Sequence, residues 1–257
     1  MALPFVRHFE PDYLFVENVP GLRNFNVKSG PLKSFLKNIG KFGCKNPQVK
    51  LLSAADYGVP QIRKRLVVMA ALGREIDFPP PTRGGQNDRP HSTAGWPWPG
   101  GLAPLALGEV DPGGPDQRAM RLSPLNLAGI RATPEGGGRS GWPERPKPGC
   151  RVGHAGRADV CGRLSFARPS PALTTKCVSR SDGRRGRPVG DRAPSVREAA
   201  CLQTFPRSFQ FSGFLMSGAR RAGNAAPPLL AGAVGKSFVT SDRKIGRDNR
   251  RLAIKTA

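Results

Sequence analysis

An acidic residue at the end of an apolar run is the first position in this sequence with the character of a catalytic group. The run is Tyr13–Val16, and Glu17 and Asn18 follow it directly. Short apolar runs are typical of buried parallel strands, and ligands of open α/β sheets bind beyond the carboxyl ends of such strands. A carboxyl group placed there can donate or accept a proton. The competing interpretation is a surface glutamate that only ends a strand.

Two arginines further along the chain share a basic segment, Gln61-Ile62-Arg63-Lys64-Arg65. Alternate residues of a strand point to the same face, so Arg63 and Arg65 are predicted to converge on one ligand. A guanidinium can donate to a carbonyl-type oxygen and pair with phosphate. The alternative is a basic strand edge that faces water.

The elements that must position these residues have α/β character over residues 1–78. Helical spacing of Leu32, Phe35, Leu36 and Ile39 predicts a helix over Pro31–Phe42, with Pro31 in its first turn. Leu3–Phe9 reads as the last turns of a helix. Further strands are expected at Val49–Leu52 and Leu66–Leu72.

The rest of the chain is less regular. Residues 79–163 contain Pro and Gly clusters that break any periodicity, which predicts a loop-rich insert or a small separate domain. Ala172–Val178 reads as a strand. Ser195 and Glu198 form a capping-box pattern at the start of a helix whose apolar face holds Ala199, Leu202 and Phe205.

A second C-terminal helix is predicted to begin at Pro227-Pro228 and to carry Leu229, Leu230, Ala233 and Val234. From Thr240 the chain is basic and lacks periodicity, which indicates a mobile tail.

Composition points to a polyanionic partner. The 257 residues include 41 Lys and Arg against 18 Asp and Glu, a net charge of +23 spread along the chain. Nucleic acid is the first candidate. An anionic membrane surface is the second, although no basic amphipathic helix supports it. No apolar run approaches a membrane span, and no signal peptide is evident, so a soluble intracellular protein is expected.

Four segments then stand in a fixed order: Y-L-F-V-E-N-V-P-G-L (13–22), A-D-Y-G-V-P-Q-I-R-K-R (55–65), S-V-R-E-A-A-C-L-Q-T-F-P (195–206) and G-N-A-A-P-P (223–228). Together they resemble the C-terminal portion of a bacterial DNA cytosine-5 methyltransferase. The resemblance implies an α/β fold: a truncated Rossmann-like sheet whose first strands are missing, with an irregular, loop-rich target-recognition domain.

The same resemblance divides the chain into four parts. Residues 1–78 are the second half of the catalytic domain, and residues 79–185 read DNA. Residues 186–239 form scaffolding and cofactor-closing helices, and residues 240–257 form the basic tail.

Particular roles follow from the resemblance as expectations. Glu17, with Asn18 beside it, protonates or hydrogen-bonds the N3 atom of a cytosine flipped out of the duplex, while Arg63 and Arg65 hold the base and its phosphate. Asn224 and Ala225 close the pocket of the methyl donor, S-adenosylmethionine. Contacts with duplex DNA are expected from Gln61, Arg192 and Arg197. Further candidates for phosphate or guanine contacts are Arg118, Arg121, Arg131, Arg139, Arg145, Arg151 and Arg157.

Two expected features of the family have no counterpart. The glycine-containing motif of the first strand is absent, and so is the Pro-Cys pair whose cysteine adds to carbon 6 of cytosine. The five cysteines all lie outside a Pro-Cys context. Cys150, His154, Cys161 and Cys177 do not have the spacing of a common zinc module, so no metal site is expected.

The chain alone is therefore predicted not to methylate DNA, and three interpretations stay open. It is a truncated enzyme without activity, one subunit of a split methyltransferase whose partner polypeptide carries the first motifs, or a non-catalytic basic DNA-binding module. RNA methylation is a remote fourth. In each case the expected location is the cytoplasm, in association with the nucleoid.

Overall fold

The computed structural model describes residues 3–24, 30–44, 46–85, 88–95, 105–138, 161–179 and 185–255. The helices are α1 (Leu3–Phe9), α2 (Gly21–Asn24), α3 (Pro31–Lys41), α4 (Pro124–Arg131), α5 (Val196–Leu202), α6 (Leu215–Asn224) and α7 (Pro228–Lys255), with a 3₁₀ turn, η1 (Ala54–Tyr57). The strands are β1 (Tyr13–Asn18), β2 (Gln48–Ser53), β3 (Gln61–Ile62), β4 (Lys64–Ala71), β5 (Val110–Asp111), β6 (Gly114–Arg118), β7 (Gly162–Arg163), β8 (Ser170–Pro171) and β9 (Arg185–Gly186).

The main sheet has the strand order β1-β4-β2, and both pairings are antiparallel. Central strand β4 is buried from Leu66 to Ala71, whereas β1 is only half-buried, with Phe15 exposed. The expectation that Tyr13–Val16 forms a buried parallel strand is therefore wrong for the pairing seen here. The apolar run signals a strand correctly, but burial is greatest where a strand has neighbours on both sides.

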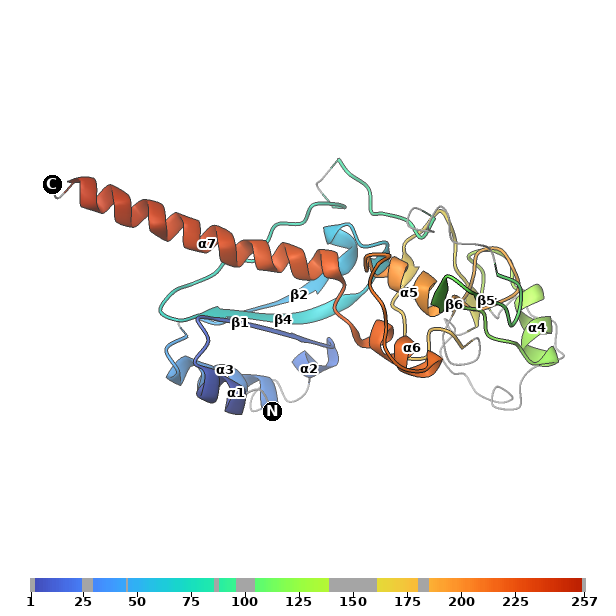
Figure 1. Ribbon diagram of the computed structural model, residues 1–257. Coiled ribbons are helices and arrows are strands. Elements are labelled where there is room, and N and C mark those ends of the chain that lie inside the picture. Colours follow the sequence, from blue (N-terminus) through green and yellow to red (C-terminus); the bar gives the residue numbers. More distant parts are fainter. Residues whose placement is uncertain are drawn as a thin grey trace.

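Helices cover both faces of this sheet (Figure 1). Side chains of β4 alternate between the faces, as the pleat requires. Val67, Met69 and Ala71 pack with Leu230 and Val234 of α7. On the opposite face, Val68 and Ala70 pack with Ile39 of α3, and partly buried side chains of α1 and α3 complete this layer.

Several local predictions for residues 1–78 are confirmed. The helix predicted over Pro31–Phe42 is α3, and its apolar positions face the sheet with Ile39 fully buried. The helix at Leu3–Phe9 and the strands at Val49–Leu52 and Leu66–Leu72 also appear, with bounds that differ by at most two residues.

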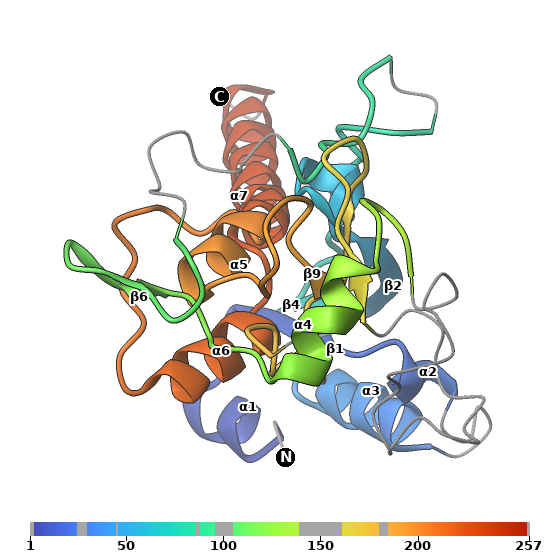
Figure 2. The same ribbon diagram turned by 90° about the vertical axis from the view of Figure 1, so that its right-hand side faces the viewer.

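A second body contains α5, α6 and the hairpin of β5 and β6 (Figure 2). Its core joins Val196, Ala199 and Leu202 of α5 to Ala219 and Ala222 of α6. The predicted capping box is confirmed: the Ser195 hydroxyl accepts from the Glu198 amide, and the Glu198 carboxylate accepts from the Ser195 amide. The start of α5 could be predicted because it depends only on side chains within one turn of the helix.

The strand predicted at Ala172–Val178 is wrong. Strand β8 comprises only Ser170–Pro171 and pairs in parallel with β3, and the chain then runs irregularly into a turn. Leu173, Cys177 and Val178 are buried because they pack in the core of the second body, not because they lie in a sheet.

Helix α7 begins at Pro228, as predicted, but it continues to Lys255. The expectation of an irregular tail from Thr240 is therefore wrong for residues 240–255, which are helical, whereas the mobility of this stretch stays a prediction. This stretch has no proline and one glycine, and each residue added to an existing helix gains a hydrogen bond. Asp242 also ties α7 to the sheet through Arg74, at 2.7 Å, and through the Tyr13 hydroxyl. Within the described residues, no helix is long and apolar enough to cross a membrane.

Candidate active site

Glu17 and Arg65 meet at one end of the main sheet. Glu17 lies opposite Val67 in the β1–β4 register, and Arg65, two residues before Val67, shares its face. The Nε atom of Arg65 is 2.5 Å from Oε1 of Glu17, and the side chains are 13% and 20% exposed. The sheet therefore brings a carboxylate and a guanidinium together at a partly open position.

Asn18 follows Glu17 at the end of β1 and is exposed. Its Oδ1 atom accepts a hydrogen bond from the Val19 amide at 2.8 Å. This contact shapes the turn into α2, so Asn18 helps to define how the chain leaves Glu17.

Arg63 occupies a different environment from Arg65. The strand is interrupted at Arg63, between β3 and β4, and its side chain is fully buried. Nη1 donates to the Leu173 carbonyl at 3.2 Å and Nη2 to the Gly223 carbonyl at 2.7 Å. Burial and then the charge of Arg65 lower the pKa of Arg63 to about 10, while Glu17 acts in the opposite direction. The expectation that both arginines hold one ligand assumed a continuous strand, and the break turns Arg63 inward.

Gln61 is also fully buried, and its Oε1 atom accepts from the Leu173 amide at 3.4 Å. The contact with DNA predicted for Gln61 gains no support from this placement. Instead, Gln61 and Arg63 hold the same neighbouring segment.

The Gly223-Asn224 motif lies at the end of α6, against that segment. A Cβ atom on Gly223 would lie 2.2 Å from the Thr174 carbonyl oxygen, so the two backbones touch directly. Asn224 is exposed and Ala225 is half-buried. Through the Arg63–Gly223 hydrogen bond, the residues predicted to close the cofactor pocket adjoin the segment that carries Arg65.

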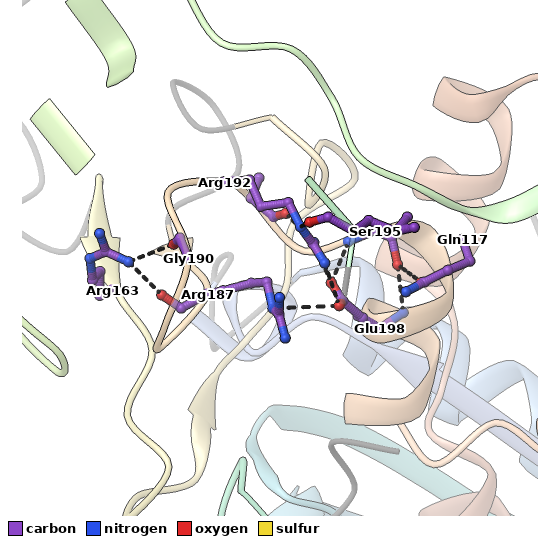
Figure 3. A network of polar contacts seen from close by, with 9 residues as sticks. Gln117, Arg163, Arg187, Gly190, Arg192, Ser195 and Glu198 are labelled. Carbon is purple, nitrogen blue, oxygen red and sulfur yellow. Dashed lines mark hydrogen bonds and ion pairs between the residues drawn. The ribbon is translucent and has the colours of Figure 1, made fainter. Parts of the chain in front are cut away.

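Arg192 and Arg197 point into the second body. Both terminal nitrogens of Arg192 donate to the Glu198 carboxylate, at 2.7 and 2.8 Å, and Arg187 lies 3.4 Å from the same carboxylate (Figure 3). Arg197 pairs with Asp116 at 3.0 Å and donates to the Phe209 carbonyl at 2.5 Å. The scaffolding role expected of this region fits these contacts. Direct DNA contacts by Arg192 and Arg197 remain predictions that their burial does not support.

Arg163 is buried as well, although the sequence did not single it out as a candidate site residue. Arg163 donates to the carbonyls of Ile130, Thr133, Arg187 and Gly190 and pairs with Asp191 at 2.5 Å. Nothing in the sequence distinguishes it from the surrounding arginines, because most of its partners are backbone oxygens from distant segments.

Of the seven arginines proposed as phosphate or guanine contacts, Arg139, Arg145, Arg151 and Arg157 lie outside the described residues. Arg131 pairs with Asp191.

The described cysteines do not offer an accessible thiolate. Cys44, Cys161, Cys177 and Cys201 are all buried, and Cys150 lies outside the described residues, as does His154. Burial raises the pKa of Cys177 to about 12 and also raises the pKa of the thiols of Cys44 and Cys201. Within the described part of the chain, no cysteine is therefore placed to act as an accessible thiolate.

Comparison with known proteins identifies the family of this chain. The family model described as C-5 cytosine-specific DNA methylase matches residues 2–93 and 138–240. The chain belongs to this family. It is 36% identical over 239 residues to the Type II methylase M.HgiDII of Herpetosiphon aurantiacus, covering 91% of this chain and 66% of that protein. It is 30% identical over 237 residues to the Type II methyltransferase M1.HphI of Haemophilus parahaemolyticus, covering 91% of this chain and 58% of that protein.

Solved structures agree on the fold. A protein described as a DNA modification methyltransferase encoded within an E. coli prophage superimposes with a TM-score of 0.63 at 17% identity, over 93% of this chain and 72% of that chain. The S. pombe Dnmt2 methyltransferase gives a TM-score of 0.55 at 15% identity, over 95% and 71%. This methylase-family chain thus has a mixed α/β fold of the Rossmann-like methyltransferase class, and it spans about three fifths to two thirds of its curated relatives.

Proposed function

We propose that this chain forms the base-binding and DNA-reading part of a DNA cytosine-5 methyltransferase. The observation that carries the proposal is the Glu17–Arg65 pair at the end of the sheet, within a chain of this family. The reaction moves the methyl group of S-adenosylmethionine to carbon 5 of a cytosine flipped out of duplex DNA.

Carbon 5 of cytosine is a poor nucleophile, so the ring must be activated. A thiolate adds to carbon 6, and electron density moves through the ring toward N3, which takes a proton or a hydrogen bond. Glu17 supplies that proton or hydrogen bond in this proposal. Arg65 lies beside it and is 13% exposed, so its guanidinium keeps the carboxyl group in place and can donate to the O2 atom of the base.

The cofactor side is assigned to Asn224 and Ala225, which follow the close contact between Gly223 and Thr174. Asn224 is exposed, so its amide is free to meet the methionine end of S-adenosylmethionine. The chain's net charge of +23 supports duplex DNA as the partner.

Activity requires a second segment that carries the thiolate and the first cofactor motif. The sequence has no Pro-Cys pair, and the described cysteines are buried. In the described part of the chain, β1 pairs only with β4, so its outer edge is available to a further strand. We assign this edge to the segment that completes the sheet, as in one subunit of a split enzyme.

A non-catalytic DNA-binding module is the second candidate, favoured by the charge and by the lack of an accessible thiol. It predicts salt-sensitive binding to duplex DNA that does not respond to S-adenosylmethionine.

A methyl-transfer assay separates these functions. Purified chain is incubated with duplex DNA and labelled S-adenosylmethionine, first alone and then with a polypeptide that carries the Pro-Cys and glycine motifs of a relative. Incorporation only after mixing supports the proposal. If neither sample incorporates label although DNA is bound and the complex has formed, the proposed methyltransferase function is contradicted. The DNA-binding module is then the remaining candidate.

A further inference from the structure

The interruption between β3 and β4 places Arg63 where three chain segments meet: the sheet, residues 173–175 and the end of α6. We call this meeting point the joint. The backbone of Arg63 is fixed by a hydrogen bond from the Ala54 amide to its carbonyl, at 3.0 Å. Its side chain reaches the Leu173 carbonyl with one terminal nitrogen and the Gly223 carbonyl with the other. One guanidinium thus connects the sheet, the 173–175 segment and the end of α6.

The 173–175 segment is held from both sides at this joint. Gln61 accepts from the Leu173 amide on the sheet side. On the other side the Gly223 backbone touches the Thr174 carbonyl so closely that no Cβ atom fits. Gln203 adds a bond to the Ala222 carbonyl, which fixes the last turn of α6 from within the second body. These contacts help to fix the Gly223-Asn224 turn relative to the sheet, together with the packing of Leu230 in α7 on β4.

The chemistry of the joint requires arginine. A planar guanidinium can donate along two directions to carbonyls of separate segments, whereas a lysine ammonium is a single point donor on a flexible stem. Arg63 is fully buried, and the nearby charges of Arg65 and Glu17 lower and raise its pKa, respectively. Arg63 thus interacts electrostatically with the Glu17–Arg65 pair, and it also holds the Gly223-Asn224 turn through a hydrogen bond.

We infer that Arg63 is a positioning residue that sets the cofactor-side turn, Gly223-Asn224, in register with the Glu17–Arg65 pair. The inference rests on the proposed function for its catalytic meaning, but the joint itself exists independently of activity. Methyl transfer requires the methyl donor and the base to be closely aligned. Loosening this joint should therefore lower kcat more than it weakens the binding of S-adenosylmethionine or of DNA.

Amide hydrogen exchange on the full chain tests the joint directly. The test variant is Arg63→Lys, and the matched control is Arg163→Lys, which alters another buried arginine held by backbone carbonyls elsewhere. In Arg63→Lys we expect exchange at residues 173–175 and 222–225 to accelerate at least ~10-fold while Val67–Ala71 stay protected. Arg163→Lys should leave 222–225 unchanged. Unchanged protection at 222–225 in Arg63→Lys overturns the inference.

Gly223→Ala approaches the same joint from the other side and covers the case in which Arg63→Lys does not fold. It should accelerate exchange at the same residues, and the double variant should lose little more protection than either single variant, because both break one unit. Additive losses contradict a shared joint.

Kinetics in the complemented enzyme separate positioning from simple stability. Arg63→Lys should lower kcat on the order of 10²-fold while KM for DNA and for S-adenosylmethionine changes less than about 3-fold. A loss confined to KM overturns the positioning role. If the wild-type mixture is silent, the proposed function fails, and the exchange experiment still decides whether the joint exists.

Discussion

Arg65 and Glu17 form an ion pair diagonally across the two antiparallel strands β4 and β1, with 2.5 Å between Nε and Oε1. The pairing register produces this contact, because Arg65 lies two residues before the partner of Glu17. Neither side chain is fully buried, so the pair keeps access to a ligand while each group holds the other in place.

Replacing Arg65 by glutamine removes the group that holds Glu17. We expect Arg65→Gln to lower methyl transfer by the complemented enzyme about 10²-fold or more, which is the usual range for a disturbed general acid. Lys64→Gln is the matched control, because it removes the same charge from the exposed neighbouring position in β4. Initial rates at saturating DNA measure the difference. Equal losses in the two variants would show that only net charge matters.

Glu198 is the buried centre of the scaffold, where Arg192 and the α5 capping box converge. Glu198→Gln leaves the Arg192 charge buried without its carboxylate, so the free energy of unfolding should fall by about 3–5 kcal/mol. Urea unfolding followed by circular dichroism measures this change. The control, Glu10→Gln at an exposed position, should stay within about 0.5 kcal/mol of wild type. A loss below about 1 kcal/mol for Glu198→Gln would contradict the buried network.

Replacing Gly223 or Gly235 by alanine should change the stability of the chain in opposite directions. A Cβ atom on Gly223 meets the Thr174 backbone, so Gly223→Ala should destabilise the chain by about 1–3 kcal/mol. Gly235 lies in α7 with open space around it, so Gly235→Ala should stabilise by about 0.5–1 kcal/mol through helix propensity. Paired urea titrations compare the two, and the same sign for both would be inconsistent with the contact at Thr174.

The stability of the folded chain should depend on pH through the thiol of Cys177. Burial raises the pKa of this thiol from 9.0 to about 12, so the folded chain binds its proton more tightly than the unfolded chain does. The resulting stability is complete below pH 9 and is lost as the pH rises from 9 toward 12, at most ~1.4 kcal/mol per pH unit. Cys177→Ala should lack this component, so the stability difference between wild type and variant should shrink over that interval. A constant difference would place the thiol in a solvated site.

Features set by neighbouring residues could be predicted from the sequence. The capping box of α5 and the apolar face of α3 depend on residues within a few positions of one another, and both appear as predicted. The pairing of β1 with β4 depends on residues about 50 positions apart, which a single apolar run cannot specify. The sequence therefore predicts both strands but not that they pair with each other in the antiparallel direction.

The candidate active site likewise combines features that the sequence predicts with features that depend on distant residues. The motifs single out Glu17, Arg63 and Arg65, but neither the Glu17–Arg65 ion pair nor the different partners of Arg63 and Arg65 could be predicted from them. Alternation along a strand assumes continuous pairing, and the break at Arg63 turns that side chain toward carbonyls at Leu173 and Gly223. Contacts of this kind leave no pattern in the sequence, because any residue can supply a backbone oxygen.

The most direct test of the account is the amount of 5-methylcytosine formed in duplex DNA by the complemented enzyme with wild-type chain or with Glu17→Gln. The two complexes are first matched for DNA binding, and the product is quantified by mass spectrometry of the hydrolysed DNA. The account predicts 5-methylcytosine from the wild-type mixture and at least ~10²-fold less from Glu17→Gln. Equal product from both would contradict the assignment of Glu17 as the group that activates the base.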